Sequence, residues 1–227
     1  MLSSRGATAL ICGALLAGCG GGKSPDVTRN VTRADLGRMA LSKRALGPLA
    51  KGLEDRKGES GPTGNRAGAD DTVDPRDTAR TLARAGRVTG YQWNYAARRR
   101  PAPKGVLGMS IEVELFRTEK AASRYLKKQI HDFERFGGRD LEGLKLASVE
   151  TFDVGDVGDE AQGVRAVARF GKDALFDTVV GFRRGRVVGS AAVFLGRELV
   201  ISSDVERIAD ALDDRIKRVA AARGQNR

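Results

Sequence analysis

The chain has 227 residues, of which 41% are hydrophobic and 30% charged, which excludes a fibrous or low-complexity protein and suits one folded domain with a lead-in segment. Its formal charge of +11 favours anionic partners, such as anionic lipid headgroups or acidic wall polymers. Both cysteines, Cys12 and Cys19, belong to the N-terminal segment, so the rest of the chain can form neither a disulfide nor a cysteine-bound metal site.

Residues 1–18 have the organisation of an export signal. Arg5 supplies the positive head, and an uncharged, largely apolar run follows from Gly6 to Gly18. This run is too short to cross about 30 Å of hydrocarbon as a helix. No later stretch approaches the apolar length that a membrane span requires.

The apolar run ends in Leu16-Ala17-Gly18-Cys19, which resembles the lipobox of bacterial lipoproteins. The resemblance implies cleavage before Cys19 and attachment of fatty acyl chains such as palmitate to this residue. It also implies a lipid anchor at the extracytoplasmic face of a cell membrane, inner or outer. Residues 19–33, which begin with a glycine-rich stretch, are expected to form the lipidated N-terminus and a flexible tether.

Residues 34–86 are predicted to form a helical lead-in. Gly37, Gly47 and Pro48 interrupt any long helix at its start, so short helical turns are expected there. Residues 54–73 are rich in charge and glycine without periodicity, which predicts a mobile loop. The pair Asp74-Pro75 then begins a short helix that ends at Gly86.

Residues 87–222 are predicted to form the folded domain. Alternating patterns predict strands at 88–95 and 106–116, and a helical stripe of Ala122, Leu126, Ile130 and Phe133 predicts a helix over 118–136. Four more strands follow near 147–154, 164–170, 175–183 and 187–195, before a last helix that begins near Ser203. Short connections predict the α+β class, an antiparallel sheet of about five or six strands with helices packed mainly on one face.

The first strand of this domain contains a candidate ligand surface. It consists of the aromatic residues Tyr91, Trp93 and Tyr95, followed by the basic turn Arg98, Arg99 and Arg100. Aromatic rings beside a basic lip can stack a base, a sugar or a lipid headgroup. The same alternation also fits a strand whose aromatic face is core, so both interpretations stay open. Nucleic acid is not expected as a partner, because the protein is predicted to be exported.

Catalysis is not expected, and neither is a cofactor. His131 is the only histidine and the exported part has no cysteine besides Cys19, so nucleophile–histidine pairs and histidine zinc sites are hard to build. A hydrolase that uses two carboxylates stays an alternative. Four carboxylates between glycines form a weak calcium candidate whose spacing is not that of an EF-hand, and the other interpretation is a turn: Asp153, Asp156, Asp159 and Glu160.

Several short segments carry a further resemblance: Gly90-Tyr91, Leu115-Phe116 before Ala121-Ala122, Gly158-Asp159-Glu160-Ala161 and the hairpin from Phe182 to Val188. Over roughly residues 87–222 this layout resembles small extracytoplasmic domains of actinobacterial lipoproteins and kinase sensor regions. The resemblance implies a non-catalytic binding or sensor-like module. The alternative function is an envelope accessory protein whose basic surface holds anionic polymers or a partner protein.

Overall fold

The computed structural model describes residues 27–39, 41, 43–66, 75–98, 105–136, 140–141, 144–170 and 173–224. The predicted signal, the lipidation site Cys19, and Arg99 and Arg100 of the candidate ligand surface lie outside the described residues. None of the described helices combines the length and the hydropathy that a membrane span requires.

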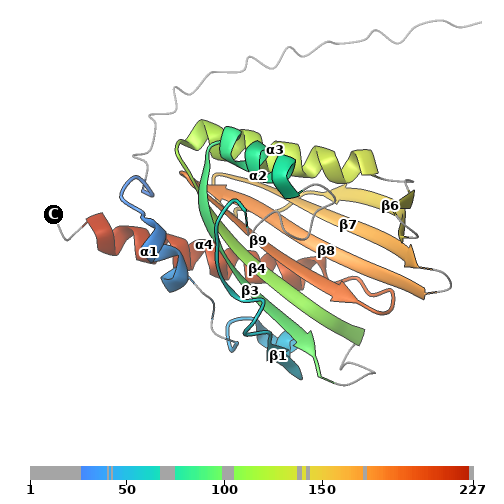
Figure 1. The fold of residues 1–227 in the computed structure, drawn as a ribbon. Helices are drawn as coiled ribbons and strands as arrows, with labels where there is room; N and C mark the ends of the chain where they lie inside the picture. Colours follow the sequence, from blue (N-terminus) through green and yellow to red (C-terminus); the bar gives the residue numbers. More distant parts are fainter. Residues whose placement is uncertain are drawn as a thin grey trace, which may run out of the picture.

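An antiparallel sheet, of nine strands over the described residues, forms the centre of the molecule (Figure 1). The strands follow the order β1-β3-β4-β9-β8-β7-β6-β5, and β2 also pairs with β3. Their bounds are β1 Leu53–Asp55, β2 Gly61–Thr63, β3 Arg87–Ala97, β4 Val106–Phe116, β5 Asp140–Leu141, β6 Leu144–Phe152, β7 Glu160–Phe170, β8 Asp173–Arg184 and β9 Val187–Leu195.

This architecture confirms the predicted α+β class and its antiparallel sheet. The sheet has more strands than the five or six predicted because β1, β2 and β5 have only two or three residues each, too few for an alternating pattern. Two of them, β1 and β2, lie within residues 54–73 or at their edge, where a mobile loop was predicted, and both pair with β3.

Helices cover both faces of the sheet. The helices α2 (Pro75–Arg84) and α3 (Glu119–Phe136) adjoin on one side, and α4 (Ser202–Gly224) crosses the other (Figure 1). Val187 and Ala191 of β9 are buried in the core that includes α4, whereas Val188 is buried with Leu126 of α3. The structure thus differs from the expectation that helices gather mainly on one face: β9 is almost continuously apolar, and such a strand needs cover on both sides.

Over the described residues, the buried hydrophobic side chains form two clusters, a larger one between α4 and the sheet and a smaller one beneath α3. The lead-in packs in the larger cluster, which is called the larger core below. The segment from the short helix α1 (Arg33–Leu36) through two 3-10 turns (Gly37–Met39 and Gly47–Ala50) to the start of β1 buries a set of apolar side chains in this core: Leu36, Met39, Leu46, Leu49 and Leu53. Arg223 near the end of α4 forms an ion pair of 2.7 Å with the buried Asp35 of α1. Thr28, inside the predicted tether of residues 19–33, is already fully buried, so the chain is packed on the domain from this residue onward.

Candidate ligand-binding cavity

The apolar stripe of α3 divides into a buried half and a partly buried half. At the start of the helix, Thr118 Oγ1 accepts a hydrogen bond of 3.1 Å from the backbone N–H of Ala121, and Ala122 and Leu126 are buried against the sheet. Ile130 and Phe133 continue the stripe at helical spacing, yet both are only partly buried. They line a cavity of about 330 Å³ between α3 and the sheet.

The floor of this cavity is formed by β4, β9, β8 and β7. Cross-strand neighbours place its lining residues in three successive rows: Glu112, Ser190, Gly181 and Gln162; then Ser110, Ala192, Val179 and Val164; then Phe194 and Asp177. Successive rows are two residues apart, so the outer rows are separated by about 13 Å along the strands. The rows cross four neighbouring strands, about 14 Å, so the floor is about as wide across the strands as it is long along them.

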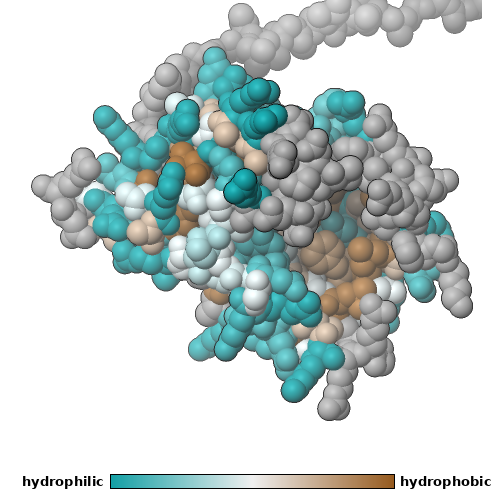
Figure 2. Space-filling model, in the orientation of Figure 1, coloured by the Kyte–Doolittle hydropathy of each residue, from teal (hydrophilic) through white to brown (hydrophobic). Residues whose placement is uncertain are grey.

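Most of the cavity surface is apolar, with a few polar groups set into it. Figure 2 shows apolar surface, in brown, in a hollow over the sheet on the face that α3 covers. The apolar lining consists of Leu126, Ile130, Phe133, Val164, Val179, Ala192 and Phe194, and the polar lining of Ser110, Glu112, Gln129, Gln162, Asp177 and Ser190. A concave, largely apolar pocket of some hundreds of Å³ with few polar groups is the usual form of a small-molecule site.

Three of the polar groups have at least one oxygen atom without a partner in the described part of the chain. Ser110 Oγ and Asp177 Oδ1 are buried without a hydrogen bond there. Glu112 faces the cavity, and within the same residues its carboxylate makes no hydrogen bond or ion pair. Because buried polar atoms are normally satisfied in folded proteins, these groups are available to a bound molecule.

Both cavity carboxyl groups are less acidic than usual. Burial raises the pKa of Asp177 to about 7, against the backbone N–H of Thr178, which lowers it. Burial also raises the pKa of Glu112 to about 7; the nearby carboxylate of Glu114 adds to this effect and Arg87 opposes it. At neutral pH each group is therefore divided between its neutral and its ionised form.

A buried polar network lies beside Glu112, next to the first row of the floor. Arg87 Nε donates a hydrogen bond of 2.5 Å to Glu114 Oε1, which also accepts one of 3.2 Å from Tyr125 Oη. Gln129 of the cavity lining donates to Tyr125 Oη over 2.8 Å. Burial raises the pKa of Glu114, and the adjacent Arg87 acts in the opposite direction.

Arg87 donates three further hydrogen bonds to the lead-in. Nη1 donates to Thr63 O over 3.2 Å and to Asn65 Oδ1 over 3.0 Å, and Nη2 donates to Thr63 Oγ1 over 3.0 Å. The guanidinium fits because Gly90 has no side chain: a Cβ there would lie 2.6 Å from Thr63 Oγ1 and overlap Arg87 Nη2. Arg87 is thus committed to Glu114 and β2 and makes no hydrogen bond to Glu112.

The aromatic residues of the candidate ligand surface lie on the opposite face of the sheet from this cavity. Trp93 and Tyr95 are each 9% exposed within the larger core, and Tyr91 stacks on Trp93 with 4.5 Å between ring centroids. Arg98 forms an exposed ion pair of 3.3 Å with Glu54. The three rings thus pack largely on the protein itself, and a ligand role for this set stays a prediction.

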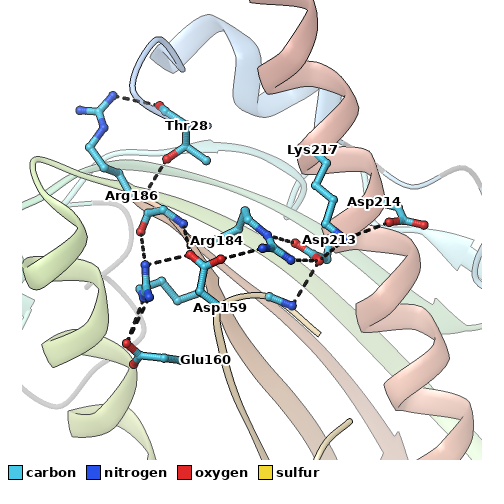
Figure 3. A network of polar contacts seen from close by, with 11 residues as sticks. Thr28, Asp159, Glu160, Arg184, Arg186, Asp213, Asp214 and Lys217 are labelled. Atoms are coloured by element: carbon cyan, nitrogen blue, oxygen red, sulfur yellow. Dashed lines mark hydrogen bonds and ion pairs between the residues drawn. The ribbon is translucent and has the colours of Figure 1, made fainter. Parts of the chain in front are cut away.

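The four carboxylates of the calcium candidate do not converge. Asp159 accepts hydrogen bonds of 3.0 Å from Arg183 and 2.6 Å from Arg184, and Glu160 pairs with Arg183 at 3.2 Å (Figure 3). Asp153 and Asp156 are exposed. Over the described ranges, no three His, Cys, Asp or Glu side chains are grouped so that they could hold a metal ion.

His131 is exposed, as expected, and lies 3.8 Å from Glu134 on the outer side of α3. The sequence interpretation missed the residues that matter most in the cavity. The alternation within residues 106–116 puts Glu112 on the polar face of its strand, opposite Ile111 and Val113, and no pattern in the sequence marks Asp177 or Gln162. One signal was present: the apolar stripe of α3 extends past Leu126 to Ile130 and Phe133, which indicates apolar surface beneath the second half of the helix.

No protein-family model and no curated protein matches the chain. Its fold is similar to that of the extracellular domain of PknH from Mycobacterium tuberculosis, with a TM-score of 0.59 and 11% sequence identity. The similarity covers 83% of this chain and 97% of the PknH domain. At this identity the likeness establishes the fold, which resembles that of an extracellular domain, and does not extend to a ligand.

Proposed function

We propose that this protein is a non-catalytic binding module, sensor-like in fold, that is lipid-anchored at Cys19 on the extracytoplasmic face of a cell membrane. Its ligand is a small molecule held between α3 and the sheet. The observation that carries the proposal is the largely apolar cavity of about 330 Å³, with unpartnered polar atoms of Ser110 and Asp177 in its wall.

Only a short segment of chain separates the proposed anchor from the folded domain. Cys19 precedes the buried Thr28 by nine residues, and a fully extended segment of that length reaches about 30 Å. The backbone N–H of Arg186 donates a hydrogen bond of 2.6 Å to Thr28 Oγ1, which fixes the end of the tether beside the turn between β8 and β9 (Figure 3). The cavity is thus held near the membrane, where amphiphilic molecules concentrate.

The arrangement of carboxylates favours binding over hydrolysis. Glu112 and Asp177 lie two rows and two strands apart, about 16 Å between their backbone positions along the sheet. Two-carboxylate glycosidases hold their carboxyl groups about 5–10 Å apart. Glu114 is nearer to Glu112, but it is buried against Arg87 and does not line the cavity.

The alternative, an accessory protein that holds anionic polymers or a partner protein on a basic surface, has less support. The arginines of the β8–β9 turn would be natural contacts for an anion. Arg183 and Arg184 are instead paired with Asp159 and Asp213, and Arg186 donates to backbone carbonyls near Thr28. A basic surface elsewhere stays the second hypothesis.

The anchor can be tested together with the cavity. Cys19→Ser in the full chain should abolish lipid labelling and move the protein from the membrane to the soluble fraction. This variant can then be purified without detergent, extracted with organic solvent and analysed by mass spectrometry for a co-purifying molecule. We expect one small molecule in roughly equimolar amount.

A second substitution shows whether that molecule occupies the cavity. Ala192→Phe places a ring in the middle of the floor, and Val200→Phe, at a side chain 75% exposed, adds the same ring to the surface. The molecule should disappear with Ala192→Phe and persist with Val200→Phe. An identical extract from both variants would count against the cavity as the binding site, and continued membrane retention of Cys19→Ser would count against the anchor.

A further inference from the structure

We propose that the cavity selects a cationic amphiphile, a molecule with a small apolar body and a protonated amine, over neutral and anionic molecules of the same size. This inference rests on the proposed binding function and adds the chemical class of the ligand. It follows from the charges that face the cavity and from its size and shape.

Arg87 compensates the negative charge of Glu112 only in part. The carboxylates of Glu112 and Glu114 are neighbours on one face of β4, and both interact electrostatically with Arg87. Arg87 donates hydrogen bonds to Glu114, Thr63 and Asn65. A single cation, Arg87, therefore lies near two carboxylates. The carboxylate that faces the cavity, that of Glu112, has no hydrogen-bond or ion-pair partner in the described part of the chain.

Asp177 is a second acidic group, at the other end of the floor from Glu112. Its row neighbours are Phe194 on β9 and Ala166 on β7, neither of which can neutralise a carboxylate. The cavity lining contains no lysine, arginine or histidine among the described residues. A chain with a net charge of +11 thus has a cavity whose charged groups, over the residues that the structure describes, are acidic.

The energetics of a buried charge decide between ligand classes. A carboxylate in an apolar wall has lost hydration and regains stability from an opposite charge with a hydrogen bond. A neutral ligand would remove the remaining water from Glu112 without replacing it, and an anion would add repulsion. The positive surface of the protein opposes a cation only weakly, because salt screens exposed charges beyond about 8 Å.

The shape of the cavity sets the apolar part. A volume of about 330 Å³ corresponds to roughly eleven water-sized groups at about 30 Å³ each. The rows of the floor extend for about 13 Å, and Ile130, Phe133 and Phe194 provide apolar contacts along this length. An unbranched chain of about ten carbons with a terminal ammonium matches both the volume and the length.

Three probes of equal length test the proposal on the unmodified binding site. We suggest calorimetric titration of the detergent-free Cys19→Ser protein at pH 8 with decylamine, decan-1-ol and decanoate, all below their micelle concentrations. Decylammonium should bind at least tenfold more tightly than decanol, and decanoate should bind most weakly. Equal affinity of amine and alcohol, or tighter binding of decanoate, would overturn the charge preference and leave the binding function standing.

Isosteric variants then locate the charge. In the double variant Glu112→Gln and Asp177→Asn, the affinity for decylammonium should fall at least tenfold while that for decanol changes less than threefold. Ala192→Phe should abolish binding of all three probes. If amine binding survives neutralisation of both carboxyls, the proposal is wrong; if none of the probes binds the parent protein, the proposed function fails with it.

Discussion

Arg87 Nε lies 2.5 Å from Glu114 Oε1 at a position where both side chains are at least 90% shielded from solvent. Two residues earlier on the same face of β4, Glu112 has no such partner in the described part of the chain. Sequence spacing makes these two glutamates look equivalent. The structure makes one of them an internal structural group and the other the acidic wall of a cavity.

Loss of Arg87 should destabilise the protein strongly. Arg87→Met leaves Glu114 buried without a counter-charge, which we expect to lower the free energy of unfolding by about 3–5 kcal/mol. Urea unfolding at pH 8 measures the change. The double variant Arg87→Met with Glu114→Leu should regain much of the loss, because no buried charge then remains.

Arg56→Met is the matched control for this substitution. It removes an arginine whose ion pair with Glu59 is more than half exposed, and such pairs contribute about 0–1 kcal/mol. Equal effects of Arg87→Met and Arg56→Met would contradict the structural role given to Arg87.

Gly90 should be intolerant of even the smallest side chain. In Gly90→Ala, the new Cβ would overlap Arg87 Nη2 and lie 2.6 Å from Thr63 Oγ1, so the arginine must move from β2 and Glu114. We expect the free energy of unfolding to fall by about 2 kcal/mol. Gly58→Ala, where a Cβ would meet nothing within 4 Å, should change it little, and thermal unfolding of the pair provides the comparison.

The two cavity carboxyls should make the protein less stable as pH rises from about 4 to about 7. Their pKa values are raised from 4.5 and 3.8 to about 7, so over this range the folded state binds more protons than the unfolded state. Stability from these groups is complete below pH 4, is lost as pH passes 7 and is then constant. Over this pH range each group lowers the free energy of unfolding by up to about 3–4 kcal/mol.

Urea unfolding at pH 5 and pH 8 tests this dependence. The double variant Glu112→Gln and Asp177→Asn cannot titrate at either position, so its stability relative to the parent protein should be higher at pH 8 than at pH 5. The same difference at both pH values would show that the two carboxyls are not perturbed by burial.

Asp213 of α4 shows the opposite behaviour. Its fully buried carboxylate accepts hydrogen bonds of 2.9 and 2.6 Å from Arg184 and one of 3.2 Å from the backbone N–H of Gly158, and Lys217 lies 2.9 Å away (Figure 3). Burial alone would raise the pKa of Asp213, but hydrogen bonds and charge from Arg184 and Lys217 together hold it below its usual value.

Asp213→Ala should therefore cost about 3–5 kcal/mol in the free energy of unfolding at pH 7, since it leaves Arg184 without its main partner. The stabilisation by Asp213 is present above pH 3.8 and is lost as pH falls through its lower folded value, so parent and variant should converge in acid. Asp214→Ala, at an exposed neighbour, is the control for chemical denaturation. A cost no greater than that of the control would refute the central place of Asp213 in the network.

Most of the fold could be predicted from periodicity, because periodicity reports which face of an element is apolar. The strands around Trp93 and Ile111 and the helix with Leu126 were found in this way. The short strands β1 and β2 were not, because their pairing with β3 depends on backbone hydrogen bonds that leave no pattern in three residues.

The cavity could not be predicted, and the reason is specific to β4. Alternation identified Ile111 and Val113 as buried and therefore Glu112 as outward, which is correct for a sheet with one solvated face. In this protein α3 covers that second face, and only the pairing of β4 with β9 brings Glu112 and Ser190 beneath it. Pairing of strands so distant in sequence is not encoded in local residue spacing.

The most direct test of the central claim is to locate a bound amphiphile in a crystal structure. Crystals of the detergent-free Cys19→Ser protein soaked with 10-bromodecylamine would reveal the bromine by its anomalous scattering. We predict the bromine between α3 and the floor strands, with the amine beside Glu112 or Asp177 and the bromine toward the opposite end of the floor. Bromine bound only outside the cavity, with the space beneath Ile130 unchanged, would contradict a ligand site between α3 and the sheet.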